Sequence, residues 1–533
     1  MIYYIADLPA DTDSLERNPV FNTIKNFELG GFDYQVLIPR LVPFLRYLGA
    51  EYGMYDGAHI VHVFDQIQDI QQTEGFPFTM DDVPLPPQTE SVYTRDQVRL
   101  YQGPQPLGQV TFNRFGFVKQ VQWISETGTR TDTYSDRGFV AGAQFKDSNG
   151  EVVRTEWYNQ DGETVLTGNS TGIHVALAKR DLFDHPDYLT MAALRTEFLN
   201  RALRQFDVTQ DYLIINIENE WLLDFAQHFE APDRIIFENI QADQRLTAAT
   251  ISKHAALLDG QTIVTDSPLQ AGQLMELETT THVQQNIELL PTFVTELNLG
   301  ESNTLAEARL YWRIGLVDDQ FKALFWRMLQ YRTDYEDLRL IMDLQAVNDQ
   351  SILEGLVTRF VNEVLEVDTS STLFAMLQTY YTAKKEHKLL EKQQKAFEAA
   401  RKQVVGFKKI DDAFHFMDNV SYRYQSDTPE LDQDLRFTRV FIDDRVQNDL
   451  FMQSRVVGAG IPIISREPSI YFSDGENGAL IENDEALFNS LSTYLQGSRE
   501  WNQALVASID KINANGTDQL IESWRGILHG QKE

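Results

Sequence analysis

The sequence contains no cysteine, so it cannot form a disulfide, a thiolate metal site or a cysteine nucleophile. Positive charge is scarce as well, because 46 lysine and arginine residues stand against 79 aspartate and glutamate residues and leave a net charge of -33. A surface this acidic repels phosphate backbones and anionic lipids. We therefore expect no nucleic-acid partner.

Long hydrophobic runs are missing too. No apolar run approaches the roughly 18 residues of a membrane-spanning helix, and the start, "MIYYIADLPADTD", lacks the positive region of a signal peptide. These absences predict a cytoplasmic protein without an integral membrane span, whose membrane contacts are peripheral. With 533 residues, of which 42% are apolar, the chain can bury large cores and has room for about two to four domains.

Short apolar runs alternate with amphipathic stretches in the first part of the chain. "MIYYIADL", "VFNTIKNFELGGF" and "YQVLIPRLVPFLRYLGAEYG" show this rhythm early, and "DYLIINI", "RIIFENI" and "TIVTDS" repeat it much later. Alternation of this kind is typical of β-α units around a parallel sheet. It predicts one Rossmann-like lobe, split between residues 1–90 and 170–290.

The inserted residues 91–169 follow a different pattern. Turn signals end at Gly116, Gly138, Gly150 and Gly162, and strand-like runs such as "QVTF", "VQWI" and "TEWY" lie between them. We expect an antiparallel β-sheet here.

This insertion is also rich in aromatic side chains. Trp123, Trp157 and Tyr158 are candidate glycan-binding residues, although a thin sheet also needs aromatic residues simply to bury one face. Trp157 and Tyr158 are neighbours in sequence, so on a strand they point to opposite faces. At least one of them is therefore open to solvent or ligand.

A second run of β-α units covers residues 291–510. It includes the amphipathic stretch "EARLYWRIGLVDDQFKALFWRMLQYR", the strand candidate "LRLIMDL" and a long helix over about residues 372–405. A C-terminal helix is expected within residues 511–533, where it can cross back to the first lobe. Two Rossmann-like lobes with an inserted antiparallel β-sheet extension predict an α/β protein with a GT-B-like fold.

Two apparent motifs have structural explanations. "GNSTG", residues 168–172, matches a hydrolase nucleophile elbow, but the following "IHVALAK" is strand-like, so we expect a hairpin turn. His59 and His62 of "HIVH" face opposite ways on a strand and have no third ligand nearby in the sequence. We expect no metal site.

The segment "GESN" leaves two interpretations open. It precedes a helix expected near Thr304, where backbone N–H groups could receive a ligand such as an anion. Ser302 and Asn303 are therefore candidate glycan-binding residues, and helix capping by either side chain explains the segment equally well.

The stretch "RVQNDLFMQSRVVGAGIPIIS", residues 445–465, predicts a helix, a glycine-proline turn and a buried strand, and the loop "SDGENG" follows it. This order resembles the nucleotide-sugar corner of retaining GT-B transferases, where E-x7-E precedes the turn. Gly460 and Pro462 fix the register, and counting back puts Gln447 and Arg455 at the two glutamate positions. An arginine has five donors and no acceptor, so Arg455 cannot accept the ribose hydrogen bonds that a carboxylate accepts.

The corner is therefore predicted to be a degenerate donor pocket, without catalytic residues and without a cofactor. The residues that form this pocket are Gln447, Arg455, Gly460, Pro462, Asp474 and Asn477. A register slip is the alternative, because Asp443, Asp444 and Asp449 lie nearby and could return a carboxylate to the pocket.

Three further segments resemble a known family, the first of the accessory Sec proteins of Gram-positive bacteria, and the likeness runs through most of the chain. They are "VFDQIQDI" at 63–70, "SDRGFVAG" at 135–142 and "ELNLGESNTLAEARLYWRIGLVDD" at 296–319. The resemblance implies a GT-B-like protein without transferase activity. It also implies that accessory secretory proteins two and three, the accessory SecA motor and the glycosylated serine-rich adhesin that they export are its partners, which would bring it to the membrane through the export machinery.

Two other functions stay open. One is an active glycosyltransferase that uses a nucleotide sugar to modify the serine-rich adhesin, and the intact turn and "SDGENG" loop support it. The other is an architectural subunit that binds no sugar.

The expected long helix concentrates positive charge. Residues 384–409 hold nine basic and three acidic residues in a chain whose net charge is -33. The lysines that form one stripe at 100° per residue are Lys384, Lys388, Lys392 and Lys395. We expect this stripe to bind an acidic partner protein; the alternative is an ordinary solvated helix face.

Overall fold

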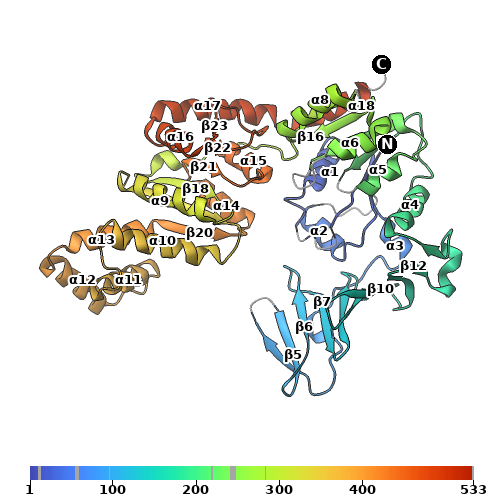
Figure 1. Ribbon diagram of the computed structural model, residues 1–533, viewed down its shortest axis with the longest axis horizontal. Coiled ribbons are helices and arrows are strands. Elements are labelled where there is room, and N and C mark those ends of the chain that lie inside the picture. The colour runs from blue at the N-terminus through green and yellow to red at the C-terminus, as the bar shows by residue number, and fades with distance from the viewer. Residues whose placement is uncertain are drawn as a thin grey trace. The chain divides into compact units, whose positions relative to one another are not determined.

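The computed structural model describes residues 1–9, 12, 14–53, 59–94, 97–217, 220–240, 248–281, 284–335 and 337–530. It divides into two compact units, each built around its own parallel sheet (Figure 1). The first unit comprises Met1–Asp266, Gln270–Thr292 and the segment from Ser523 onward, and the second comprises Ser267–Leu269 and Phe293–Glu522.

The first unit contains a seven-stranded parallel sheet in the order β17-β16-β15-β14-β1-β2-β3. Its strands are β1 (Ile2–Ile5), β2 (Tyr34–Ile38), β3 (Ile60–His62), β14 (Tyr212–Asn216), β15 (Ile235–Asn239), β16 (Thr262–Thr265) and β17 (Asn286–Leu289). The strands "IYYI" and "YLIIN" are buried along their whole length, as expected for a parallel sheet that is covered on both faces.

Short helices connect these strands. They are α1 (Pro19–Leu29), α2 (Leu45–Glu51), α3 (Val63–Ile67), α4 (Met191–Ala202), α5 (Glu220–Ala226), α6 (Ala248–Lys253), α7 (Ala255–Leu258) and α8 (Pro268–Thr281). The last helix, α18 (Thr517–Gly530), begins in the second unit and ends in the first. There the Trp524 ring meets the Phe27 ring edge-on at 5.1 Å, and Arg525 Nη2 donates to the Gly30 carbonyl at 3.2 Å.

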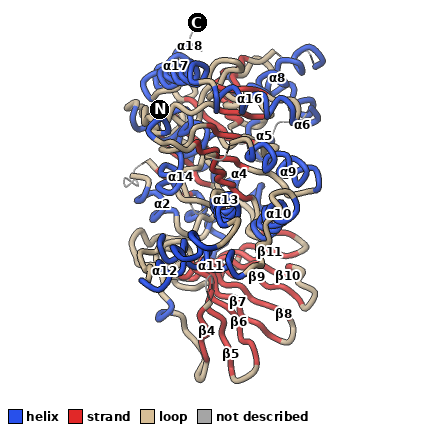
Figure 2. Tube along the Cα trace, turned by 90° about the vertical axis from the view of Figure 1, so that its left-hand side faces the viewer, coloured by secondary structure: helices blue, strands red, loops and turns tan. Residues whose placement is uncertain are grey.

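A ten-stranded antiparallel sheet, the β-extension, is inserted between β3 and β14. Figure 2 shows β4 to β11 lying side by side. The strands are β4 (Glu90–Tyr93), β5 (Gln97–Gln102), β6 (Gln105–Phe112), β7 (Val118–Ser125), β8 (Gly128–Tyr134), β9 (Val140–Asp147), β10 (Val152–Tyr158), β11 (Thr164–Asn169), β12 (Gly172–Val175) and β13 (Asp187–Tyr188).

The turns of the β-extension form where the sequence predicts them. Gly116, Gly138, Gly150 and Gly162 all have φ between 79° and 87°, in the left-handed region that glycine adopts without strain. "GNSTG" forms the hairpin turn between β11 and β12, where Asn169 pairs with Gly172. The hairpin prediction is therefore confirmed, and Ser170 has no helix after it.

The second unit contains a six-stranded parallel sheet in the order β20-β19-β18-β21-β22-β23. Its strands are β18 (Ala308–Arg313), β19 (Leu338–Leu344), β20 (Val420–Tyr424), β21 (Val440–Asp443), β22 (Ile463–Ser465) and β23 (Gly478–Leu480). The helices are α9 (Asp319–Thr333), α10 (Asp349–Glu363), α11 (Thr372–Lys385), α12 (Glu391–Gln403), α13 (Phe407–Asp418), α14 (Thr428–Leu435), α15 (Leu450–Gly458), α16 (Asp484–Gln496) and α17 (Ser498–Ala514). Two Rossmann-like sheets and the inserted β-extension confirm the predicted fold class.

The helix expected near Thr304 does not form. Ser302–Thr304 makes a single 3-10 turn, and the chain then enters β18, which pairs with both β19 and β21. Leu310, Tyr311 and Trp312 are all fully buried. A strand covered on both faces shows no alternation of polar and apolar residues, so its periodicity does not distinguish it from a buried helix.

The single helix expected over residues 372–405 is also wrong, because the segment forms a hairpin of α11 and α12. The chain turns at His387, whose φ is 56°. This turn lets the Tyr380 and Phe397 rings stack at 4.0 Å, whereas on one straight helix they would lie about 25 Å apart. Aromatic packing therefore outweighs the continuous helical propensity of the segment.

Candidate functional site

The glycine-proline corner of the second unit has the predicted backbone. α15 ends at Gly458, the chain turns at Gly460 with φ of 71°, and Pro462 leads into β22. A positive φ strains any residue that has a Cβ atom, and a Cβ atom on Gly460 would also lie 2.2 Å from Leu505 Cδ1, so glycine suits this turn. The helix begins later than the sequence suggests, at Leu450, because Asp449 Oδ1 accepts a hydrogen bond from the Met452 N–H at 3.0 Å and caps it.

Arg455 lies on α15 and forms a two-point ion pair with Asp432 of α14. Nε lies 2.7 Å from Asp432 Oδ1, and Nη2 lies 2.5 Å from Oδ2. Each side chain is about one third exposed. The guanidinium is thus held by a carboxylate of its own unit.

Gln447 precedes the helix rather than belonging to it. Its backbone carbonyl accepts a hydrogen bond from Arg313 Nη1 at 2.8 Å. The same arginine nitrogen lies 2.7 Å from Asp443 Oδ1. Gln447 therefore stands beside a buried ion pair at the ends of β18 and β21.

The aspartates that a register slip would bring into the pocket are all engaged. Asp443 is fully buried, and its Oδ2 accepts from Gln453 Nε2 at 3.0 Å and from the Asp449 N–H at 3.1 Å. Asp444 Oδ1 lies 2.5 Å from Arg466 Nε, and burial raises the pKa of this aspartate. Each of these aspartates already binds a donor of the second unit.

The "SDGENG" loop is held by its own side chains. Asn477 is fully buried; its Oδ1 accepts from the Ser473 N–H at 2.8 Å, and its Nδ2 donates to the Tyr471 carbonyl at 3.1 Å. Asp474 Oδ1 accepts from the Leu480 N–H at 2.8 Å. Asp474 and Asn477 thus shape the loop, and any ligand role for them stays a prediction.

Ser302 and Asn303 lie on the 3-10 turn that precedes β18. Ser302 is buried, and Asn303 Oδ1 accepts a hydrogen bond from Arg439 Nη1 at 2.9 Å. No helix follows, so the predicted anion site at a helix N-terminus is wrong. A glycan contact by either side chain stays a prediction.

The four predicted lysines do not form a stripe on one helix. Lys384 ends α11, Lys388 lies in the turn, and Lys392 and Lys395 lie on α12. Two of them have acidic neighbours: Lys388 Nζ lies 3.0 Å from Glu386 Oε2, and Lys395 Nζ lies 2.6 Å from Glu391 Oε1. Partner binding by this hairpin stays a prediction.

The three candidate aromatic residues of the β-extension divide between its two faces. Trp123 donates from Nε1 to Asp132 Oδ2 at 3.0 Å and packs on the apolar side, against the cluster of Val98, Leu100 and Val110. The Tyr158 hydroxyl donates to Glu156 Oε2 at 2.6 Å, and its ring is buried. Only Trp157 reaches the other face, where it lines a cavity.

This other face, which we call the polar face, consists of two rows of side chains that run across the strands. The first row is Gln109, Gln122, Thr131, Gln144, Thr155 and Gly168; the second is Thr111, Gln120, Thr133, Gly142, Trp157 and Leu166. Each residue is the cross-strand partner of the next, so the side chains of a row lie on one side of the sheet.

The polar face is hollowed. Residues of both rows, with Leu41 and Lys146, line a cavity of about 330 Å³. Gly142 and Gly168 make room for Trp157, since a Cβ atom on Gly168 would lie 3.1 Å from the Cζ3 and Cη2 atoms of the indole. The indole therefore lies over the neighbouring strand and forms one wall of the cavity.

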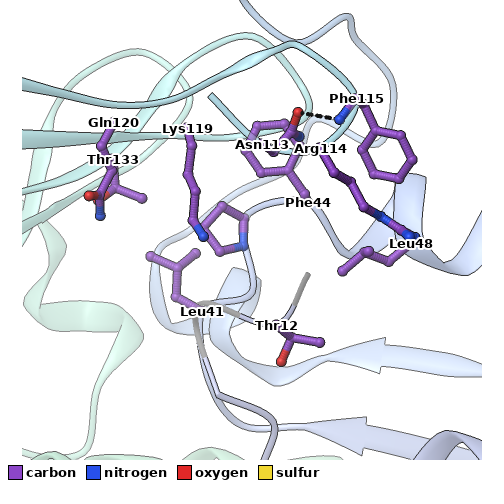
Figure 3. Close-up of a pocket in the computed structure, with 11 residues that line it drawn as sticks. Thr12, Leu41, Phe44, Leu48, Asn113, Arg114, Phe115, Lys119, Gln120 and Thr133 are labelled. Carbon is purple, nitrogen blue, oxygen red and sulfur yellow. Dashed lines mark hydrogen bonds between the residues drawn. The ribbon is translucent and has the colours of Figure 1, made fainter. Parts of the chain in front are cut away.

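A second hollow of about 160 Å³ adjoins the first, and the two share Leu41, Gln120 and Thr133. Figure 3 shows its lining, with Lys119, Gln120 and Thr133 from the β-extension on one side and Phe44 and Leu48 on the other. The Asn113 Oδ1 atom accepts from the Phe115 N–H at 3.0 Å and holds the tip of the β6–β7 hairpin above the hollow. Its apolar walls and basic side chains distinguish it from the first cavity.

Sequence reasoning missed the polar face, although a signal was present. In "GQVTF", "KQVQW" and "TRTDTY" glutamine or threonine recurs at every second position. Such positions share one face of a strand.

Two comparisons at the level of sequence identify relatives. The family model of the accessory Sec system proteins, for the first protein of that series, matches residues 9–530. A protein of the same description from Streptococcus gordonii is 23% identical over 537 residues, which cover 96% of this chain and 93% of that protein.

Solved structures share the fold. The Glycosylation Associate Protein (Gap123) complex from Streptococcus agalactiae matches with a TM-score of 0.73 and 18% identity, over 98% of this chain and 99% of that one. Accessory secretory protein 1, 2 and 3 in Streptococcus pneumoniae matches with a TM-score of 0.72 and 19% identity, over 100% and 99%. The pneumococcal O-GlcNAc transferase GtfA, in complex with UDP and GlcNAc, matches with a TM-score of 0.64 and 13% identity, over 100% and 99%.

Among the helices within the described ranges, none is both long and apolar enough to cross a membrane. The structural matches include a GT-B glycosyltransferase, and the two parallel sheets are those of the GT-B fold. Because the family model spans nearly the whole sequence, this chain belongs to the family of the first accessory Sec system protein.

Proposed function

We propose that this protein is a non-catalytic GT-B component of an accessory Sec export system. In this proposal it binds the glycosylated serine-rich adhesin, accessory secretory proteins two and three, and the accessory SecA motor. It acts in the cytoplasm and reaches the membrane through the export machinery. Accessory secretory proteins two and three are supported as partners by the solved relative that contains accessory secretory proteins 1, 2 and 3 together.

The observation that carries the proposal is the ion pair of Arg455 with Asp432. Arg455 stands where a retaining GT-B enzyme needs a carboxylate that accepts hydrogen bonds from the ribose, and a guanidinium offers donors only. Gln447, at the other position, carries no charge. Since Asp443 and Asp444 are paired with Arg313 and Arg466, the corner holds its charges in internal ion pairs.

The test of non-catalysis is a turnover assay. The protein is incubated with a serine-rich acceptor peptide and each common nucleotide sugar, with a heat-inactivated sample as the blank and an active GT-B transferase as the positive control. We expect no release of nucleotide and no sugar transfer above the blank. Turnover with any donor would establish an enzyme and overturn the proposal.

A rescue variant sharpens this test. The change Arg455→Glu alone would set two carboxylates side by side, so it is combined with Asp432→Asn. We expect no activity from the double variant, because transition-state groups must be positioned together. A measurable rate would mean that the rest of the donor pocket is complete.

Binding is tested separately. The protein, alone and with accessory secretory proteins two and three, is titrated with glycosylated serine-rich adhesin. Binding to the adhesin is the expected result, whereas its absence in both samples would refute the binding role and favour an architectural subunit.

An active glycosyltransferase is the second candidate function. The intact glycine-proline turn and the ordered "SDGENG" loop favour it, because they preserve the backbone that lies beneath a donor in this fold. The turnover assay decides between the two candidates.

A further inference from the structure

The polar face has amide groups that are not used by the protein itself. Within the described parts of the chain, the side chains of Gln109, Gln122 and Gln144 make no hydrogen bond, although each is half-buried. An amide offers two donors and an acceptor, which suits the hydroxyl and acetamido groups of a sugar. Half-buried amides without protein partners are therefore available to a ligand.

The face offers side chains rather than backbone. The strands that form it, β6 to β11, pair on both edges, so their N–H and C=O groups are used in the sheet. An extended peptide usually binds a sheet through its backbone at an exposed edge. A face without free backbone groups is better suited to a polyhydroxylated ligand than to a bare peptide.

The cavity is nearly uncharged, in a chain whose net charge is -33. Among its lining residues, Glu156 pairs with Arg154 and accepts a hydrogen bond from the Tyr158 hydroxyl, and both contacts lie on the opposite side of the sheet. Lys146 therefore supplies the charge that faces the cavity. A diphosphate would need several cations. The lining therefore disfavours a nucleotide sugar or an acidic glycan and favours a neutral sugar.

Trp157 supplies the apolar wall that a sugar ring requires. Its indole lies beside Gly142 and over Gly168, and its side chain is half-buried. A volume of about 330 Å³ lies at the small end of ligand sites, which suits one or two sugar rings.

From these observations we infer that the polar face binds a neutral N-acetylhexosamine of the glycosylated adhesin, with the ring against Trp157 and its polar groups on the Gln109, Gln122 and Gln144 amides. The site thus binds sugar that is already attached to the adhesin, and it does not bind the nucleotide-sugar donor. This inference rests on the adhesin-binding function proposed above and adds its ligand class and location.

The experiment is a calorimetric titration of the full-length protein with two probes. One is a serine-rich peptide that carries O-linked N-acetylglucosamine, and the other is the same peptide without sugar. The glycopeptide should bind at least about tenfold more tightly than the bare peptide. Equal affinity for the two would overturn the ligand class.

Trp157→Ala and Trp123→Ala form a matched pair, because both remove a tryptophan from the same sheet but from opposite faces. We expect Trp157→Ala to weaken glycopeptide binding roughly tenfold and Trp123→Ala to leave it unchanged. Circular dichroism establishes that each variant is folded. Should a tryptophan variant fail to fold, Gln122→Leu and Gln144→Leu test the same site, and each is expected to weaken binding severalfold.

The outcomes separate this inference from the proposed function. If Trp157→Ala, Gln122→Leu and Gln144→Leu all bind the adhesin as tightly as the parent protein, the adhesin site lies elsewhere. That result would overturn the inference, while the proposed function would stand. Loss of adhesin binding by the parent protein, even with its accessory partners, would refute the proposed function itself.

Discussion

The glycine-proline corner and the polar face treat their polar side chains in opposite ways. At the corner, Arg313, Arg455 and Arg466 are paired with the aspartates Asp443, Asp432 and Asp444. On the polar face, glutamine amides and threonine hydroxyls stand in rows and make few hydrogen bonds with one another. One of these is the bond from Gln120 Nε2 to Thr133 Oγ1 at 3.4 Å. The charged groups of the corner are paired within the protein, whereas the polar face has amide groups that can bind a ligand.

This difference teaches where a ligand site is to be sought in a fold that resembles an enzyme. The sequence predicts a donor pocket at the corner, yet the ion pairs there compete with any ligand for the same groups. The polar face has no counterpart in a catalytic motif, yet its neutral groups cost little to desolvate when a sugar replaces water. Side chains with unused hydrogen-bonding groups therefore indicate a ligand site in this protein better than position in the fold does.

The largest expected effect comes from breaking a buried ion pair at the corner. Arg313→Met would leave the fully buried Asp443 without its arginine, and such a loss costs about 3–5 kcal/mol of unfolding free energy. Adding Asp443→Asn to this variant should restore part of the lost unfolding free energy. Chemical denaturation measures both variants, with Gln122→Leu on the polar face as the control, where a change within about 0.5 kcal/mol is expected. Equal destabilisation by Arg313→Met and Gln122→Leu would remove the contrast between the two regions.

Two buried carboxyl groups of the first unit provide the next effect. Burial raises the pKa of Asp266 to about 8 and that of Glu238 to about 7, while Thr292 donates to the first and Thr23 to the second. Both groups are protonated in the folded state at pH values where the unfolded chain has lost the proton. Their contribution to stability is thus complete below about pH 4 and is lost as the pH rises through 7 to 8.

Thermal denaturation between pH 5 and 8 measures this effect. We expect the stability of the first unit to fall throughout that range, and we expect Asp266→Asn with Glu238→Gln to flatten the dependence. A parent protein that becomes more stable over the same pH range would contradict the assignment of neutral carboxyls.

A smaller effect should follow from displacing Trp157 without removing it. The change Gly168→Ala would place a methyl group 3.1 Å from the indole and from Ile173 Cδ1, so the ring must shift by a few tenths of an ångström. We expect a severalfold loss of glycopeptide affinity with less than about 1 kcal/mol change in stability. Gly272→Ala, whose added methyl meets open space, is the matched control. Unaltered affinity of the Gly168 variant would show that the position of the ring does not matter.

The smallest effect on stability is expected at the α11–α12 hairpin. Lys384, Lys388, Lys392 and Lys395 are changed together to glutamate, and the capture of accessory secretory proteins two and three and of the SecA motor is measured at rising salt. We expect weaker capture by the variant and a decline with salt in the parent, since exposed charges are screened. Lys322→Glu on α9 controls for the loss of positive charge elsewhere in the unit. Identical, salt-independent capture would leave the lysines as ordinary solvated surface.

Local patterns in the sequence predicted much of this fold. The β-α rhythm indicated both parallel sheets, glycine spacing indicated the turns of the β-extension, and Gly460 with Pro462 indicated the turn between α15 and β22. Each of these features depends on neighbours along the chain, which is why a single sequence contains them.

The features that the sequence did not predict depend on contacts between residues far apart in the chain. Arg455 meets Asp432 only because α14 and α15 pack together, and the stacking of Tyr380 on Phe397 bends a segment that contains no proline or glycine. The rows of the polar face depend on the pairing register of six strands, β6 to β11, and the pairing of β6 with β7 includes a bulge between Thr111 and Phe112. A shift by one residue would send every side chain of a row to the opposite face.

The passage of α18 from the second unit into the first has a consequence for synthesis. Translation proceeds from the N-terminus, so Phe293–Glu522 leaves the ribosome before Trp524 can reach Phe27. The part of the first unit that precedes the second unit in the chain must therefore wait for α18, which follows the second unit. Nascent chains stalled before Trp524 should therefore carry an unfinished first lobe, exposed to chaperones and proteases for the time that the intervening residues take to be made.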